Sequence, residues 1–220
     1  NANVSGVSAG SYTIVVKDAL NCTDTGVVMI NEVDPPLNIT AFTSGSPTVC
    51  AGQLGVTYAV ASQTTVTYFW NYSGGVASIN GTGNNVDIDF GNTPGTGTLS
   101  VYGQNSCSVT PVLTATIQVI AVPNLVVAGS NNMCANSQEV LTASGATSYT
   151  WNTGANTTTV VISPSVTSIY TVTGTNANGC VAMTEYTMNV NASPTVQVTG
   201  STLSVCPNQT VALTAIGNGN

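Results

Sequence analysis

Acidic side chains are the residues of this sequence that could do chemistry, and they are few. Asp87 and Asp89 alternate along a predicted strand, so their carboxylates project from one face about 7 Å apart. Two carboxylates at such a distance could serve glycoside hydrolysis or bind calcium. No supporting catalytic group stands near them in the sequence, and we interpret the pair as a solvated strand face.

A second acidic pair, Glu32 and Asp34, stands beside two prolines at a predicted boundary between modules. Carboxylates at a junction of this kind can bind calcium and stiffen the connection. Ordinary linker charge explains the same residues. We expect no cofactor, and calcium at one of the two acidic pairs is the only metal site the sequence indicates.

The basic residues are almost absent: the sequence has no histidine, no arginine and a single lysine, Lys17. A Ser–His–Asp triad cannot be built, and the commonest metal-binding side chain is missing. One lysine cannot neutralise a nucleic-acid backbone or hold an anionic membrane surface. No run of about 18 apolar residues occurs either. We therefore predict a protein that is not an enzyme, binds no nucleic acid and does not insert into a membrane.

The cysteines are widely spaced, and none belongs to a Cys-x-x-Cys pair, which disfavours zinc and redox sites. Charged residues make up only 4% of the chain, while hydrophobic residues make up 42%. In an acidic chain rich in Thr and Asn, this cysteine pattern indicates disulfides and an extracellular location. The six residues are Cys22, Cys50, Cys107, Cys134, Cys180 and Cys206.

One repeated pattern ends at a cysteine. Tyr12 stands ten residues before Cys22, and Tyr170 stands ten residues before Cys180. Thr and a β-branched residue follow the tyrosine in both copies, and Ala recurs nearer the cysteine. A looser copy precedes Cys107. We interpret this pattern as the end of a module.

A second pattern begins at a cysteine. Cys134 and Cys206 are each followed by Asn at the second position, Leu-Thr-Ala at the seventh to ninth and Gly at the eleventh. Cys50 opens a more divergent copy. We interpret this pattern as the start of a module, so ends and starts alternate along the chain.

The alternation predicts two disulfides inside complete modules, because each start is followed by an end. Two cysteines are then left for partners beyond this sequence or in another copy of the chain. The predicted pairs are Cys50–Cys107 and Cys134–Cys180, and the two remaining cysteines are Cys22 and Cys206.

Prolines mark the boundaries between the modules. Residues 1–36 are predicted to be the closing part of one module, and 194–220 the opening part of another. Complete modules are predicted over 37–121 and 122–193. Short linkers that contain proline are stiff, so we expect the modules to form an extended rod.

Period-two alternation and closely spaced turn residues predict an all-β chain of immunoglobulin-like sandwiches. Val86, Ile88 and Phe90, for example, alternate with the two aspartates. Each complete module has one tryptophan, Trp70 or Trp151, which we interpret as a core aromatic. An exposed sugar-binding platform is the alternative interpretation.

The residues also resemble known families. The stretch from Cys134 to Cys180 resembles Ig-like repeats of giant secreted surface proteins of Bacteroidota, and residues 67–107 (TYFWNYSGG through GQNSC) resemble PKD-like modules of the same proteins. Residues 8–22 (SAGSYTIVVKDALNC) resemble closing strands of repeats in gliding-motility adhesins. The resemblance implies type IX secretion, exposure at the cell surface, and adhesion, gliding or filament formation.

The function that we expect is structural: a stalk or repeat segment of an extracellular surface adhesin or filament. Its partners would be neighbouring modules of the same long chain. A surface of such low charge reduces the electrostatic repulsion between copies, so self-association into fibres is also expected to be possible. Two alternatives are a polysaccharide-binding module and a spacer of a secreted polysaccharide-degrading enzyme.

Overall fold

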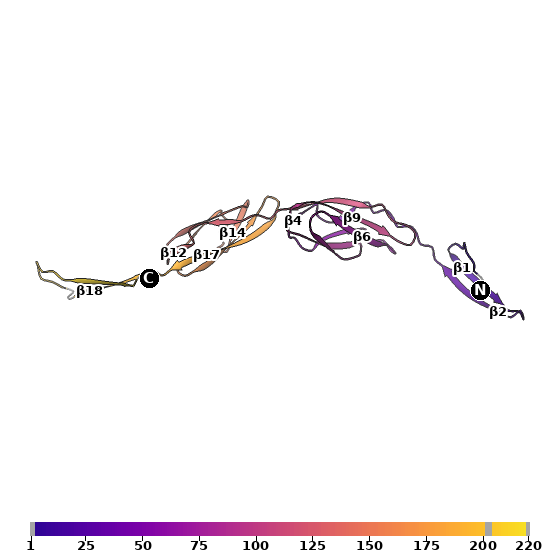
Figure 1. Cartoon of the computed structure of the whole chain (residues 1–220), viewed down its shortest axis with the longest axis horizontal. Coiled ribbons are helices and arrows are strands. Elements are labelled where there is room, and N and C mark those ends of the chain that lie inside the picture. Colours follow the sequence, from indigo (N-terminus) through magenta and orange to yellow (C-terminus); the bar gives the residue numbers. More distant parts are fainter. Residues whose placement is uncertain (1–2, 201–203, 219–220) are drawn as a thin grey trace. The chain divides into compact units, whose positions relative to one another are not determined.

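The computed structural model describes residues 3–200 and 204–218, and every regular element in these ranges is a β-strand (Figure 1). The predicted all-β class is confirmed. Within the described ranges no helix is long and apolar enough to cross a membrane. The chain divides into two compact units, Asn1–Val119 and Ile120–Asn220, and each is described by itself.

The first unit contains a sandwich of two four-stranded sheets. Strand pairing joins one sheet in the order β4 (Thr48–Cys50), β10 (Leu113–Ile120), β9 (Gly95–Gln104) and β6 (Thr67–Ser73). It joins the other in the order β3 (Phe42–Ser44), β5 (Val56–Val60), β8 (Asn85–Phe90) and β7 (Ala77–Asn80).

The core of this first sandwich follows from the alternation along its strands. On β8, Val86, Ile88 and Phe90 are at most 2% exposed, while Asp87 and Asp89 lie on the outer face. These three apolar side chains pack with residues of the other sheet, including Leu99 and Ile117. Burial of each such side chain stabilises the fold by about 1.5–3 kcal/mol.

The second unit contains a smaller sandwich. One sheet has the order β11 (Val126–Ala128), β13 (Glu139–Ser144) and β15 (Thr159–Ile162). The other has the order β12 (Asn132–Cys134), β17 (Val181–Asn191), β16 (Ser168–Thr175) and β14 (Ser148–Trp151). Leu141, Trp151, Val172 and Met188 meet between the two sheets.

Two hairpins flank the sandwiches in sequence. β1 (Gly10–Lys17) pairs with β2 (Thr23–Ile30), and β18 (Thr195–Gly200) pairs with β19 (Leu213–Asn218), both antiparallel. Their apolar side chains stay exposed, as Val16 at 65% shows. A two-stranded hairpin cannot bury such a face without further strands.

Candidate functional site at the module ends

The cysteines that open a module start the same tight turn in all three copies. The residue at the second position after the cysteine has a positive φ, which type II turns require and which Gly and Asn adopt most readily. These residues are Gly52 (φ 76°), Asn136 (φ 61°) and Asn208 (φ 64°). The amide at the third position donates to the cysteine carbonyl at 3.1 Å in each copy, from Gln53 to Cys50, Ser137 to Cys134 and Gln209 to Cys206. We call these the start turns.

The cysteines that close a module belong to a different turn. In the second sandwich, Asn176 Oδ1 accepts hydrogen bonds from the amides of Asn178 and Cys180, both at 3.0 Å. Gly179 has a φ of 82° and donates its amide to the Asn176 carbonyl at 3.1 Å. This turn joins β16 to β17, and we call it and its two equivalents the end turns.

The equivalents of this end turn use the same acceptor atom. In the hairpin β1–β2, Asp18 Oδ1 accepts from the amides of Leu20 and Cys22 at 2.8 and 2.9 Å. In the first sandwich, Asn105 Oδ1 accepts from the amides of Cys107 and Ser108 at 2.9 and 3.1 Å. The side-chain oxygen of one Asn or Asp therefore fixes each end turn.

The end turns of the two sandwiches also hold the chain that enters them. Asn105 Nδ2 donates to the Asp34 carbonyl at 2.7 Å, and Asn176 Nδ2 donates to the Ala121 carbonyl at 2.8 Å. The thiol of Cys107 donates to the carbonyl of Val33 on the same incoming segment. We call the two asparagine contacts the linker clasps.

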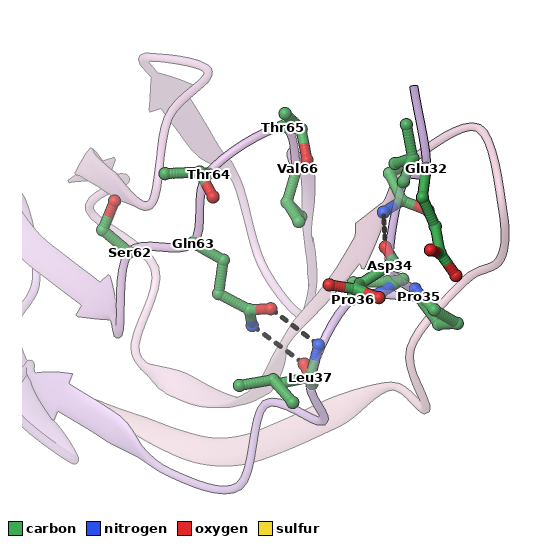
Figure 2. A pocket seen from close by; sticks show the side chains of 12 residues that line it. Glu32, Asp34, Pro35, Pro36, Leu37, Ser62, Gln63, Thr64, Thr65 and Val66 are labelled. Atoms are coloured by element: carbon green, nitrogen blue, oxygen red, sulfur yellow. Dashed lines mark hydrogen bonds between the residues drawn. The ribbon is translucent and has the colours of Figure 1, made fainter. Parts of the chain in front are cut away.

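A pocket of about 550 Å³ lies beside the first linker clasp. Figure 2 shows Glu32 and Asp34 on one side of it and the loop of residues 62–66 on the other. Gln63 closes the floor with two hydrogen bonds to the backbone of Leu37, one from the Leu37 amide at 2.7 Å and one to its carbonyl at 2.8 Å. The linker is thus fixed to the sandwich at two separate points.

The acidic residues do not gather into a metal site of the usual kind. Glu32 and Asp34 line the pocket as a pair, and residues 3–200 and 204–218 contain no group of three or more His, Cys, Asp or Glu side chains that could hold an ion. Calcium prefers six to eight oxygen ligands. Calcium binding at these residues stays a prediction.

Asp87 and Asp89 act as hydrogen-bond acceptors on the outer face of β8. Asp87 Oδ1 accepts from the Thr57 hydroxyl at 2.6 Å. Asp89 accepts from the Gly55 amide at 2.7 Å and from Asn80 Nδ2 at 2.9 Å. These contacts join β8 to its two neighbours, so the carboxylates support the sheet.

The predicted pair Cys134–Cys180 is corrected by the structure, in which Cys180 is disulfide-bonded and Cys134 is free. The two residues lie at opposite ends of β17. Cys134 pairs with Asn191 at the carboxyl end of β17, and Cys180 precedes its first residue. β17 has 11 residues, so its ends are about 34 Å apart, while the Cα atoms of a disulfide lie within about 7 Å. Figure 1 shows β12 and β17 side by side.

The predicted pair Cys50–Cys107 is corrected for the same reason. Cys50 is disulfide-bonded and Cys107 is free. Cys50 ends β4, which runs beside the carboxyl end of β10, since Gln118 donates its amide to Pro47 at 2.8 Å. Cys107 precedes β10, whose eight residues span about 24 Å. Cys22 and Cys206 are free and exposed.

The tryptophans do not form an exposed platform. Trp151 is 2% exposed and donates Nε1–H to the Thr157 carbonyl at 2.9 Å. Trp70 is partly buried against the first core and donates to the Gly83 carbonyl at 2.9 Å. Buried indole rings usually satisfy the N–H in this way.

Sequence reasoning missed one exposed aromatic ring, that of Phe69. Phe69 is 42% exposed and stacks on Tyr102, with ring centroids 4.9 Å apart and an interplanar angle of 15°. It borders a shallow depression of about 500 Å³ that Gln104 and Asn105 also line. Side chains alternate between the two faces of β6, so Phe69 lies on the face opposite to the buried Tyr68. This alternation is the sequence signal that could have indicated the exposure of Phe69.

Comparison with known proteins gives one family match. Residues 35–119 match the family described as the PKD-like domain. No curated protein matches the chain.

Comparison with solved structures gives matches of low identity and low TM-score. The Bacteroides ovatus mixed-linkage glucan utilization locus protein SGBP-B is 14% identical with a TM-score of 0.24, and the match covers 90% of this chain and 57% of that one. The D0–D1 domain of Intimin is 12% identical with a TM-score of 0.32, over 70% of this chain and all of that one. Domains 4–9 of the surface layer protein SbsC are 14% identical with a TM-score of 0.32, over 89% and 37%. The chain thus spans little more than half of the first of these structures, and its residues 35–119 are similar to a PKD-like domain.

Proposed function

We propose that this chain is a non-catalytic stalk segment of an extracellular surface adhesin or filament. The observation that carries the proposal is the repeated linker clasp. Asn105 and Asn176 belong to two different sandwiches, yet each uses Oδ1 to fix its own end turn and Nδ2 to hold the incoming linker. A device repeated at successive modules supports a role in which the connection between modules matters.

Each clasp stabilises the bound conformation of its linker by a modest free energy. A hydrogen bond of this type contributes about 0.5–1.5 kcal/mol. The first linker has two further hydrogen bonds through Gln63, and Pro35 and Pro36 limit its backbone. Together these contacts favour one linker conformation, as a stalk requires.

The chemistry of the side chains supports a non-catalytic role. The chain has no histidine, and the tightest carboxylate pair accepts hydrogen bonds from Thr57, Gly55 and Asn80 on its own sheet. These contacts give the two carboxylates a structural role in the sheet. A spacer between parts of a secreted polysaccharide-degrading enzyme would be built from the same modules.

The disulfide-bonded state of Cys50 and Cys180 supports an extracellular location, because disulfides persist in oxidising compartments. Export by the type IX pathway and exposure at the cell surface follow from the resemblance to surface proteins of Bacteroidota and are part of the proposal.

The clasp is tested by replacing the donor and keeping the acceptor. Asn105→Asp retains an oxygen for the end turn, as Asp18 does naturally, but removes the Nδ2 donor to Asp34. We expect the backbone order parameters of residues 31–36, measured by nitrogen-15 relaxation, to fall from about 0.85 toward 0.6 or below. Those of β9 and β10 should stay unchanged.

The control for added charge is Asn71→Asp, an exposed position on β6. It should leave residues 31–36 as ordered as in the unaltered chain. Linker residues that already have order parameters below 0.6 in the unaltered chain would contradict the proposed stalk.

A second function, polysaccharide binding, is favoured by the exposed ring of Phe69. Sugar rings stack on aromatic faces, and amide side chains such as those of Gln104 and Asn105 can bond the hydroxyl groups. Phe69 and both amides line the same depression. The ring is held in place by its stacking on Tyr102.

Affinity electrophoresis through gels containing soluble mixed-linkage β-glucan or xylan tests this second function. Binding at Phe69 predicts slower migration in one of these gels, lost in Phe69→Ser and kept in Phe69→Tyr. Equal mobility of all three proteins in both gels would leave the stalk as the only function supported.

A further inference from the structure

The depression at Phe69 and the pocket at the first linker lie at the same end of the first sandwich. β6 begins at Thr67, directly after the loop of residues 62–66, and β9 ends at Gln104, directly before the end turn. Antiparallel pairing places Thr67 opposite Gln104, so the loop and the end turn leave the sheet side by side. Asn105 of that turn holds the linker at this same end.

The two cavities share part of their lining, because Thr65 and Asn105 border both. The depression has a volume of about 500 Å³ and the pocket a volume of about 550 Å³. Each lies within the range of about 300–1,000 Å³ that is usual for ligand sites. A ligand that crosses Thr65 and Asn105 therefore has the depression on one side and the pocket on the other.

The loop of residues 62–66, which forms one wall of the pocket, is fixed from below by a buried tyrosine. Tyr68 is 6% exposed, and its hydroxyl accepts a hydrogen bond from the Gln63 amide at 2.8 Å and donates one to the Ala61 carbonyl at 2.9 Å. The Gln63 side chain bonds Leu37 across the floor. A wall that is already held in place loses little conformational entropy when a ligand binds.

The side chains of the pocket suit an uncharged sugar chain. Glu32 and Asp34 are exposed carboxylates that accept hydrogen bonds from hydroxyl groups, and the hydroxyls of Ser62 and Thr64 both donate and accept. The two carboxylates repel uronate and sulfate groups. The only base of the chain, Lys17, lies on β1 and is not among the residues that line either cavity.

We propose that the depression and the pocket form one groove for an uncharged polysaccharide chain, which lies against Phe69, crosses Thr65 and Asn105 and ends against the linker. The inference rests on the second function proposed above. It extends that function by specifying an uncharged ligand and a site that is longer than the depression at Phe69.

A ligand in this groove is coupled to the conformation of the linker. The walls of the pocket come from the linker on one side and from the loop of residues 62–66 on the other (Figure 2). A sugar chain that contacts both walls binds the clasped linker better than a released one. Coupling of this kind is reciprocal, so the ligand favours the clasp by the same factor by which the clasp favours the ligand. Binding of polysaccharide therefore stiffens the stalk at this linker.

Calorimetric titration with oligosaccharides of three and six sugar units, prepared from mixed-linkage β-glucan and from xylan, tests the length of the site. The six-unit ligand of the polysaccharide that binds should bind about tenfold more tightly than the three-unit one, the gain expected from one or two further hydrogen bonds. Phe69→Ser should abolish the binding of both.

A bulky side chain at Ser62 separates the two halves of the groove, because Ser62 lines the pocket and not the depression. In Ser62→Trp the affinity for the six-unit ligand should fall to that for the three-unit ligand, which should itself be unchanged. Thr64→Trp, on the same loop, should repeat this result. The matched control is Ser165→Trp, at an exposed position of the second sandwich, and it should bind both ligands as the unaltered chain does.

The coupling is measured in the variant that has lost the clasp. In Asn105→Asp, a saturating concentration of the six-unit ligand should raise the backbone order parameters of residues 31–36 back toward about 0.85. The three-unit ligand should leave them low, because it does not reach the linker.

Different results would overturn different parts of the proposal. Binding that depends on Phe69 but is unchanged in Ser62→Trp and Thr64→Trp would confine the site to the depression and remove the groove, while polysaccharide binding would stand. Equally tight binding of a six-unit polygalacturonate would contradict the preference for an uncharged chain. No binding of either neutral oligosaccharide would remove the second function and the groove together.

Discussion

The Asn and Asp residues of the end turns differ in one atom, the Nδ2 of Asn, and this atom decides whether the residue binds the linker as well as its own turn. Asp18, Asn105 and Asn176 all offer Oδ1 to the amides of their own turns. Only the two asparagines carry an Nδ2 donor, and both use it on the incoming linker. An Asn-to-Asp exchange is therefore neutral for the turn and unfavourable for the linker.

A buried tyrosine gives the first sandwich a stability that depends on pH. Tyr58 is 2% exposed and donates its hydroxyl hydrogen to the Ser46 carbonyl at 2.7 Å. Burial, with the nearby Tyr72, raises the pKa of Tyr58 to about 12 from 10.0. The unfolded chain loses this proton near pH 10 and the folded chain does not, so the free energy of unfolding falls as pH rises from 10 to 12.

Tyr58→Phe should reduce that fall by up to about 1.4 kcal/mol per pH unit over this range. Urea unfolding of the first sandwich at pH 8, 10 and 11 measures it. The variant should also lose about 1 kcal/mol at pH 8 with its hydrogen bond. An unchanged slope between pH 10 and 11 would show that Tyr58 ionises as freely in the folded chain as in the unfolded one.

At the scale of the elements, the loop between β13 and β14 depends on one glycine of the start pattern. Gly145 has a φ of 98°, and a Cβ built there would overlap the carbonyl oxygen of Asn124. The loop therefore lies directly against the linker backbone. Gly154 has a similar φ of 89° but no atom within 4 Å of its Cβ position.

Gly145→Ala should destabilise the second sandwich by about 2 kcal/mol or more relative to Gly154→Ala, because both carry the strain of a positive φ and only the first adds an overlap. Thermal unfolding of the two variants makes the comparison. Equal melting temperatures would mean that the linker moves away from the loop without cost.

The strands and turns of both sandwiches could be predicted from local pattern. Alternation identified the buried face of β8. The Asn at the second position after Cys134 and Cys206 was noted only as a repeated position, although Asn is a residue type that adopts the positive φ found there. These features depend on a few neighbouring residues, so the sequence carries them directly.

The cysteine pairing could not be predicted in the same way. The order of starts and ends along the chain suggested partners within a module, but β17 holds Cys134 and Cys180 at its opposite ends. The parallel pairing of β12 with the far end of β17 decides this, and no local pattern shows it. Phe69 was missed because the neighbouring Trp70 was the residue interpreted as the aromatic side chain of functional or structural importance.

At the scale of the whole chain, the two sandwiches have separate cores. Leu141 is fully buried in the second core and Leu99 in the first. Leu141→Ala should lower the free energy of unfolding of the second sandwich by about 2.5–5 kcal/mol and leave the first unchanged. Leu99→Ala should do the reverse.

Tryptophan fluorescence separates the two transitions. In a Trp70→Phe background Trp151 reports on the second sandwich, and in a Trp151→Phe background Trp70 reports on the first. The guanidinium titrations are run under reducing conditions, so that no disulfide contributes to either transition. A shift of both transitions by either leucine variant would contradict independent cores.

The linker clasp of the second sandwich has a consequence for a chain under tension. Asn176 Nδ2 holds the Ala121 carbonyl, so a pulling force on this linker reaches the clasp before it reaches the strands. The clasp is one hydrogen bond, which contributes about 0.5–1.5 kcal/mol, and it therefore yields before the sandwich unfolds.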